Sequence, residues 1–418
     1  MKISDIKSNP KNPRKITDSK LNSLKKSLET FGDLGGIVFN VRSNQLVGGH
    51  QRVKTLSPDW KITKSPKKDK TGTVAVGSIE TPWGNLSYRE VDWDSEIESQ
   101  ANIAANKHGG EFDRILLSDA ITSLGPELDN DLIGFSKCEI SRIVGLPDED
   151  VDVEKEVSKK ADDIKVNLGD IFELGNHRLI CGDGINSETF NRLLGGGGVD
   201  LLITDPPYGV SIGSKNKDIS RFKKSGIKED ILNDNLDAAS LRDILIQVFK
   251  NSHDKLNQGA SFYVTAPQGG SLGLMMQTVM KDSGLPVNHV LIWVKNAATF
   301  SLGRLDYSYQ HEPIFYGWKE GSHKFYGKNE TSVWKIDKPV SSKLHPTMKP
   351  IELYARAMCN SSVEGDIILD PFGGSGTCIM AAESLNRKAR VIELDPHYCS
   401  VIISRWELAT GKKHKTLK

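Results

Sequence analysis

Short apolar runs alternate with stretches of helical periodicity along residues 164–418. The runs predict buried strands, and they lie at residues 201–204, 261–265, 290–294, 367–370 and 390–393. A helical pattern at residues 378–385 separates the last two. Strands that alternate with helices predict a Rossmann-like, doubly wound α/β domain whose ligand site lies at the strand ends.

The N-terminal part of the chain has a different pattern. Leu21, Leu24 and Leu28 recur at helical spacing and predict a helix over residues 18–31, with Asp18 as its N-cap. Short strands are expected at residues 37–41 and 46–47, and the turn GGHQR follows at residues 48–52. This order predicts a smaller α+β domain.

The two parts are joined by residues of mixed character. Residues 114–147 carry apolar positions on two helical faces, whereas residues 148–163 are charged and lack aromatic side chains. The charged stretch predicts a solvated linker or an exposed helix. We therefore expect an N-terminal domain at residues 1–113, a helical extension and charged linker at 114–163, and the α/β domain at 164–418.

The composition is ordinary for a soluble globular protein. Of the 418 residues, 26% are charged and 37% are hydrophobic. No apolar run approaches the length of a membrane span, and the first residues lack the apolar core of a secretory signal, so we expect a cytoplasmic protein. The five cysteines contain no CxxC pair. We expect them to be reduced core residues and expect no metal site.

The first chemical signal is a DPPY tetrapeptide, Asp205, Pro206, Pro207 and Tyr208, directly after an apolar run. The Asp205 carboxylate and the Pro206 carbonyl could each accept one N–H bond from a planar NH2 group and favour its lone pair for attack on a methyl group. The prolines stiffen the loop, and Tyr208 offers a face for stacking an unpaired base. The alternative is a strand-ending turn with a surface tyrosine.

The second signal is a glycine loop between a strand and a helix. The strand ends at Asp370, and the loop contains Phe372, Gly373, Gly374, Ser375 and Gly376. Such glycines let the backbone approach a ligand closely. Glu393 ends the next strand, twenty positions after Gly373, which suits a carboxylate that accepts both hydroxyls of a ribose. Because no GxGxxG pattern and no Walker lysine are present, an adenosyl ligand without phosphates fits best. The alternative is a glycine turn that packs a helix on a sheet.

Together these segments resemble the beta group of amino-methyltransferases, which use S-adenosylmethionine to methylate adenine-N6 or cytosine-N4 in DNA. The catalytic motif precedes the cofactor loop, as in that group. The segment HPTMKP, with Thr347 and Lys349, resembles a part of the group's cofactor pocket, and Asp183 resembles the acidic residue that binds the cofactor's adenine. Further matches resemble the strand and loop that face the target base: Trp293, Lys295, Tyr309, His311 and Glu312. The resemblance covers residues 164 to 411.

This resemblance implies a site-specific DNA methyltransferase with S-adenosylmethionine as cofactor, double-stranded DNA as partner and a flipped target base. The implied catalytic residues are Asp205, Pro206, Pro207 and Tyr208. The implied cofactor-binding residues are Asp183, Thr347, Lys349, Asp370, Phe372, Gly373, Gly374, Ser375, Gly376 and Glu393. The DPPY form of the motif favours adenine-N6 as the methylated group. The alternative substrates are cytosine-N4 in DNA, RNA, and a protein glutamine.

The N-terminal order of elements and the GGHQR turn resemble the ParB-like domain of partition proteins, which also occurs ahead of DNA methyltransferases. Gln51 stands where an arginine is usual, so nucleotide (CTP) binding by this domain stays doubtful. A ParB-like DNA-binding regulator with a vestigial methyltransferase domain stays an alternative, and a homodimer stays open.

The net charge of +1 conceals clusters of basic residues. One cluster follows the DPPY motif in a polar stretch: Lys215, Lys217, Arg221, Lys223, Lys224 and Lys228. We expect this stretch to be a loop that contacts DNA phosphates and becomes ordered on DNA. Binding of this kind would associate the protein with the nucleoid, and no membrane partner is expected.

Overall fold

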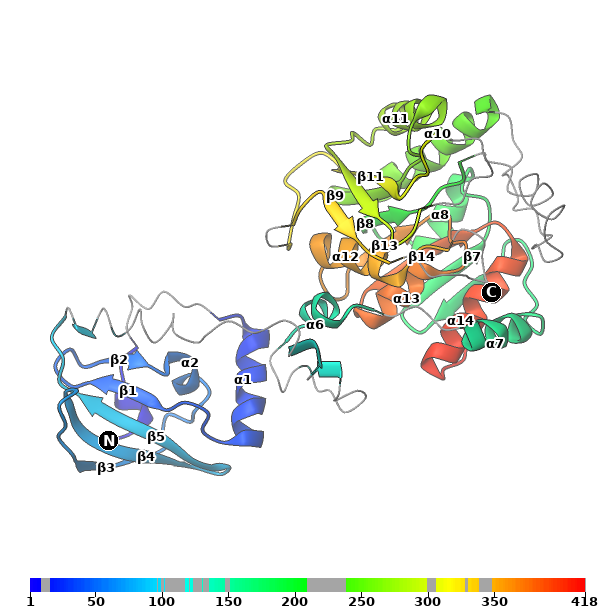
Figure 1. Cartoon of the computed structure of the whole chain (residues 1–418). Coiled ribbons are helices and arrows are strands. Elements are labelled where there is room, and N and C mark those ends of the chain that lie inside the picture. Colours follow the sequence, from blue (N-terminus) through cyan, green and yellow to red (C-terminus); the bar gives the residue numbers. More distant parts are fainter. Residues whose placement is uncertain are drawn as a thin grey trace. The chain divides into compact units, whose positions relative to one another are not determined.

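The computed structural model divides into two compact units, Met1–Val144 and Gly145–Lys418 (Figure 1). It describes residues 1–8, 16–95, 97–98, 101, 117–119, 121–122, 130, 135–146, 151–208, 238–298, 306–327, 330–337 and 348–417. The basic stretch at 215–228 and the residue Thr347 lie outside the described residues, so the predictions made for them stay predictions.

The N-terminal unit is built on a five-stranded sheet with the order β2-β1-β5-β4-β3. Its core includes Leu28, Ile37, Leu46 and Ile79. The α+β fold predicted for the N-terminal part of the chain is confirmed. The elements are η1 (Ile3–Asp5), α1 (Asp18–Phe31), β1 (Ile37–Asn40), β2 (Gln45–Gly48), α2 (His50–Val53), β3 (Ile62–Pro66), β4 (Thr73–Thr81) and β5 (Gly84–Val91).

The helix predicted at residues 18–31 is confirmed by α1, but its predicted N-cap is wrong. Thr17 has the extended backbone of a cap (φ −79°, ψ 157°), and its side chain accepts a hydrogen bond from the Lys20 amide at 3.4 Å. Asp18 is therefore the first helical residue. Its carboxylate is still placed favourably, because negative charge is stabilised near a helix N-terminus.

The charged segment that sequence suggested as a linker is in part a packed helix. Helix α7 (Val151–Ala161) buries Val157 and Ala161 against Val401 of α14 (Pro396–Thr410). The Ser404 hydroxyl donates to the Val157 carbonyl at 2.8 Å. Of the two predicted alternatives, the helix is confirmed over residues 151–161. It is not wholly exposed, since three-to-four-residue spacing of a few apolar side chains is enough to give a charged helix one buried face. Helix α6 (Lys137–Val144) precedes it in the chain, within the stretch predicted to be helical.

The C-terminal unit contains a ten-stranded sheet with the order β12-β10-β11-β9-β8-β13-β14-β7-β6-β15. The five neighbours β9, β8, β13, β14 and β7 are mutually parallel. All five predicted strands are confirmed. The strands are β6 (Ile171–Leu174), β7 (His177–Cys181), β8 (Val199–Thr204), β9 (Leu256–Thr265), β10 (His289–Val294), β11 (His311–Trp318), β12 (Val333–Lys335), β13 (Ile367–Asp370), β14 (Lys388–Glu393) and β15 (Lys415–Leu417).

Helices cover both faces of this sheet. Helices α8, α10 and α11 contact one another in one group, and α12, α13 and α14 in a second. In β8, Leu202 packs in the core with α10 side chains, whereas the next residue, Ile203, lines a cavity with Leu353 of α12. Successive strand residues point to opposite faces, so the two groups lie on opposite sides and the doubly wound α/β prediction is confirmed. The helices are α8 (Ser187–Leu194), α10 (Ala238–Lys255), α11 (Gly270–Asp282), α12 (Ile351–Ser361) and α13 (Thr377–Ser384), with α14.

The sheet reverses its direction of winding between β8 and β13. From β13 the chain continues through α13 to β14 on one side, and from β8 through α10 to β9 on the other. Where two neighbouring parallel strands are followed by helices on opposite faces of the sheet, a crevice forms outside the carboxyl ends of those strands. The DPPY loop follows β8 and the glycine loop follows β13, so both motifs meet at this point.

Two further expectations concern the cysteines and membranes. Cys181, Cys378 and Cys399 are free and buried, as expected. Among the helices that the structure describes, none combines the length and apolar character that crossing a membrane requires.

Candidate active site

Two aspartates mark the carboxyl ends of the central parallel strands. Asp205 directly follows β8, and Asp370 ends β13, whose residues Ile368 and Leu369 pair with Leu201 and Leu202. The Thr204 hydroxyl donates to Asp370 Oδ1 at 2.6 Å. This hydrogen bond joins the strand of the DPPY motif to the strand of the glycine loop.

Three side chains, one from the same loop and two from distant parts of the chain, hold the Asp205 carboxylate. The Thr265 hydroxyl, at the end of β9, donates to Oδ1. The Tyr208 hydroxyl donates to the same oxygen at 3.2 Å, and the Lys349 ammonium donates to Oδ2 at 2.7 Å. Each carboxylate oxygen therefore has a fixed partner, and the carboxylate is oriented before any substrate arrives.

Lys349 belongs to a buried row of alternating charges. Its ammonium also lies 3.3 Å from Glu312 Oε2, and Glu312 Oε1 accepts from the Lys295 ammonium. Lys349 and Lys295 are among the buried residues, and the Glu312 side chain is 12% exposed. The row thus runs Lys295, Glu312, Lys349, Asp205, and we call it the charge row.

The protonation states of the charge row follow from this arrangement. Burial opposes the charge on Glu312, but the ammonium groups of Lys349 and Lys295 lower the pKa of its carboxyl to about 2. Burial likewise opposes the charge on Lys349, yet the carboxylates of Asp205 and Glu312 raise its pKa above the usual range. Opposite charges within a few ångströms favour the ionised forms, so these two members are charged at neutral pH.

The glycine loop is fastened to the ends of β13 and β14 by its backbone. The Phe372 amide donates to Asp370 Oδ1 at 3.1 Å, and the Gly374 amide donates to Glu393 Oε2 at 2.7 Å. A Cβ atom at Gly373 would lie 2.5 Å from Val391 Cγ1. Gly376 has φ +83°, and a Cβ there would lie 2.9 Å from Ile402 Cγ1. Glycine is therefore required at both ends of the loop.

Glu393 has oxygen lone pairs to spare for a ligand. Its Oε1 accepts from the Asp395 amide at 2.9 Å, and Oε2 accepts from Gly374. Because each carboxylate oxygen can accept two hydrogen bonds, and the side chain is only partly buried, a diol such as ribose fits this position. Burial raises the pKa of Glu393 to about 7 and that of Asp370 to about 8.

The predicted adenine-binding segment lies beside Glu393. The Gly182 amide donates to the Glu393 carbonyl at 2.9 Å, because β7 and β14 are adjacent parallel strands. The next residue, Asp183, has an exposed side chain whose Oδ1 accepts from the Ile185 amide at 2.9 Å. The structure thus brings Asp183, Glu393 and the glycine loop to one edge of the sheet.

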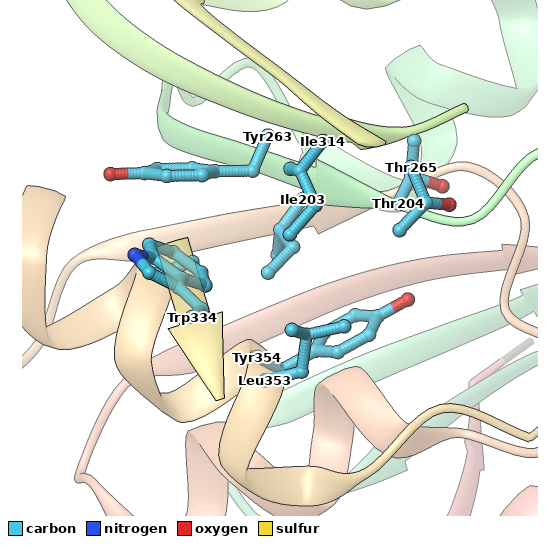
Figure 2. A pocket seen from close by; sticks show the side chains of 9 residues that line it. Ile203, Thr204, Tyr263, Thr265, Ile314, Trp334, Leu353 and Tyr354 are labelled. Atoms are coloured by element: carbon cyan, nitrogen blue, oxygen red, sulfur yellow. The ribbon is translucent and has the colours of Figure 1, made fainter. Parts of the chain in front are cut away.

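A small, mainly apolar cavity lies beside the end of β8, next to the DPPY loop (Figure 2). Thr204 and Thr265 line it at one end and Trp334 at the other, with Ile203 and Tyr354 between them. Burial raises the pKa of the Tyr354 hydroxyl well above its usual range, with Asp370 and Asp205 adding to the effect. Sequence reasoning missed Thr204, Thr265 and Tyr354. A polar residue at the end of an apolar run is the signal that could have identified the two threonines, since Thr204 ends the motif strand β8 and Thr265 ends its neighbour β9.

Part of the chain is similar to known proteins. Residues 199–404 match the N6/N4 methylase family model, which is described as DNA methylase. The Type II methyltransferase M.HpaI of Haemophilus parainfluenzae is 28% identical over 262 residues, which covers 55% of this chain and 74% of that protein.

Two solved structures show similarity to this chain at low sequence identity. The M1.HpyAVI–SAM complex is 21% identical, with a TM-score of 0.41 over 54% of this chain and 97% of that chain. A C-terminally truncated ParB from Caulobacter crescentus, complexed with CTP-γ-S, is 16% identical with a TM-score of 0.26, covering 37% of this chain and 80% of that chain. A score this low does not establish a common fold, and the ParB-like character of the N-terminal unit remains a prediction.

Proposed function

We propose that this protein, of which residues 199–404 match the N6/N4 DNA methylase family model, transfers a methyl group from S-adenosylmethionine to the N6 amino group of adenine in double-stranded DNA. The observation that carries the proposal is the Asp205 carboxylate, which Thr265, Tyr208 and Lys349 orient at the strand end next to the glycine loop. The DPPY form of the motif supports adenine over cytosine.

The cofactor supplies an electrophilic methyl group on a sulfonium. The residues present fit such a ligand: Glu393 would accept the ribose hydroxyls, Asp183 would bind the adenine, and the backbone of residues 372–376 would lie against the rest. No lysine or arginine for a phosphate is found among the described residues of this loop, which run from Pro371 to Thr377. That agrees with an adenosyl ligand that lacks phosphates.

The chain's own residues would prepare the target nitrogen. The exocyclic nitrogen of adenine is a weak nucleophile, because its lone pair is delocalised into the ring. Asp205 and the Pro206 carbonyl would accept its two hydrogens and so favour a lone pair directed at the methyl group. Tyr208 would stack on the flipped base. Holding the two reactants in line supplies most of the acceleration, since no covalent enzyme intermediate is needed.

The test replaces Asp205 by alanine. We expect Asp205→Ala to lower the rate of methyl transfer by at least about 10²–10³-fold, the usual effect of removing a group aligned with the transition state, while cofactor affinity is retained. Transfer is measured with tritiated S-adenosylmethionine and unmethylated genomic DNA, and the nucleosides are identified by mass spectrometry. Asp282→Ala, which removes a carboxylate in a surface pair with Arg242, is the matched control and should keep full activity.

The nucleoside analysis also separates the alternatives. N6-methyladenine is the expected product. N4-methylcytosine would replace the adenine assignment, and methylation of RNA or protein in preference to DNA would replace the substrate class. Cofactor binding without any transfer by the wild-type protein would favour a vestigial domain in a DNA-binding regulator.

A further inference from the structure

The hairpin formed by β3 and β4 carries a concentration of positive charge that the proposed function does not use. Residues 61–72 contain five lysines and one aspartate, whereas the whole chain has a net charge of +1. All five lysines are exposed. Three of them lie beyond the end of β3, in the turn that leads into β4, and we call them the tip lysines: Lys67, Lys68 and Lys70.

Carboxylates do not offset the charge of the tip lysines. In β3 itself, Lys64 pairs with the buried Glu90 at 2.6 Å. The tip lysines have no carboxylate within ion-pair distance among the residues that the structure describes. The carboxylate of Asp69 lies in the same turn, but it accepts hydrogen bonds from the Thr71 amide at 2.9 Å and from the Thr71 hydroxyl at 2.7 Å. The turn thus presents three exposed ammonium groups to the solvent.

Arg89 of β5 adds a fourth cation and helps to hold the turn in place. Its Nε donates to the Thr73 hydroxyl at 2.8 Å, and its Nη2 donates to the Thr71 hydroxyl at 2.7 Å. The guanidinium lies 5.7 Å from the centre of the Trp93 ring, whose indole N–H donates to the Thr71 carbonyl at 2.8 Å. A Cβ atom at Gly72 would overlap Trp93 Nε1. The turn is therefore ordered before a partner arrives, which lowers the entropic cost of binding.

Protection of the sheet edge accounts for only part of this charge. Strand β3 is the last in the order β2-β1-β5-β4-β3 (Figure 1), and lysines on an edge strand oppose pairing with a strand of another molecule. Lys64 in β3, and Lys61 directly before it, suit that task. The tip lysines lie outside the strand, so edge protection does not require them.

We propose that the tip lysines and Arg89, which together we call the hairpin patch, contact the phosphate backbone of duplex DNA. Exposed lysines without carboxylate partners suit phosphates, which are bound without regard to base sequence. The choice of DNA as the polyanion rests on the proposed function, in which DNA is the substrate of the same chain. Because both units belong to one chain, contacts at the hairpin patch would raise the local concentration of DNA at the methyltransferase unit.

The test neutralises the tip lysines in the full chain by combining Lys67→Gln, Lys68→Gln and Lys70→Gln. Binding to a labelled DNA duplex is measured by fluorescence anisotropy over a range of salt concentrations. Each lost phosphate contact lowers the slope of log K against log salt by about 0.9, so we expect a slope smaller by about 2–3 and a dissociation constant at least about tenfold higher at about 0.1 M salt. The KM for DNA should rise, whereas kcat at saturating DNA and the affinity for S-adenosylmethionine should be unchanged.

Two further variants control for charge. Arginine at the three positions of the tip lysines keeps the charge and should keep the wild-type affinity for DNA. The same change from lysine to glutamine at Lys20, Lys25 and Lys26, which are exposed on α1, alters the net charge of the N-terminal unit equally. This second control should lower the affinity for DNA far less than neutralisation of the tip lysines.

The outcomes separate the hairpin patch from the proposed function. Equal losses of affinity in the hairpin and α1 variants, or an unchanged salt slope in the hairpin variant, would overturn the hairpin patch while methyl transfer by the wild-type protein remained. A larger loss of affinity for an RNA duplex than for a DNA duplex of the same sequence would overturn DNA as its partner. Absence of methyl transfer by the wild-type protein would overturn the proposed function, and a loss of DNA affinity in the hairpin variant would still support the hairpin patch.

Discussion

Chemically identical side chains have different tasks at this site because their neighbours differ. Asp205 faces the Lys349 ammonium, whereas Asp370, among the residues that the structure describes, receives hydrogen bonds from Thr204 and the Phe372 amide. Burial raises the pKa of Asp370 to about 8. Under the proposed function, Asp205 would accept a hydrogen bond from the substrate, whereas Asp370 joins the two loops through its hydrogen bonds.

A pH-dependent cofactor affinity is expected from Glu393. Burial raises the pKa of its carboxyl to about 7, and the ionised form is the better acceptor for ribose hydroxyls. Affinity for S-adenosylmethionine should therefore increase as the pH rises from about 6 to about 8, by up to about tenfold per unit. Isothermal titration calorimetry measures this. Glu393→Gln should bind weakly with a flatter profile, and a wild-type affinity independent of pH over this range would contradict the assignment.

At the scale of elements, the glycine loop depends on how closely α13 and α14 pack. Gly376 is the N-cap of α13 and has a left-handed backbone. Its position against Ile402 of α14 leaves no room for a side chain. The loop conformation is therefore imposed both by the local backbone and by a neighbouring helix.

Gly376→Ala tests this double constraint. We expect the free energy of unfolding to fall by about 1–3 kcal/mol, since a left-handed residue with a side chain is strained, and cofactor affinity to fall as the loop shifts. Gly411→Ala is the matched control, because Gly411 also has a positive φ (+70°) at a helix end but would place its Cβ in open space. The control should lose stability, measured by urea denaturation, without losing cofactor affinity.

At the scale of the whole molecule, each unit has its own core, and Glu407 joins distant parts of the C-terminal unit. Its carboxylate, 3% exposed, pairs with Lys160 of α7 at 2.9 Å and with Lys413 at 3.0 Å. It also accepts from the His414 amide. One residue of α14 thereby holds the first helix of the unit and the segment that leads into its last strand.

Glu407→Gln should destabilise the C-terminal unit at neutral pH. Burial opposes ionisation, but Lys160, the His414 amide and Lys413 lower the pKa of Glu407 to about 2. A carboxyl whose pKa is depressed on folding stabilises the fold above its ordinary pKa, and this stabilisation is lost as the pH falls toward the folded value. We expect a loss of about 1–3 kcal/mol at pH 7 that shrinks below about pH 4. Urea denaturation at both pH values checks this; a difference independent of pH would contradict it.

The sequence by itself determined the elements and the two motif loops. The local features were the alternation of strands and helices, the prolines after β8 and the glycines after β13. Such features can be predicted because adjacent residues determine the local backbone preference. They were sufficient to predict five strands of the C-terminal sheet, the helix at residues 18–31 and the strand-end positions of Asp205, Asp370 and Glu393. They could not show that residues 151–161 would pack one face on α14, because burial depends on a partner elsewhere in the chain.

The tertiary structure alone decided which side chains surround Asp205. Thr265 lies 60 residues and Lys349 lies 144 residues along the chain from it. These two side chains reach Asp205 because of the order of strands in the sheet and the position of α12 next to β8. Local residue spacing predicts neither of these. Sequence resemblance related Lys349 to the cofactor pocket, whereas the structure shows its ammonium on Asp205 and Glu312. Electrostatic interactions depend on distance in space, and so the charge row emerges only from the folded chain.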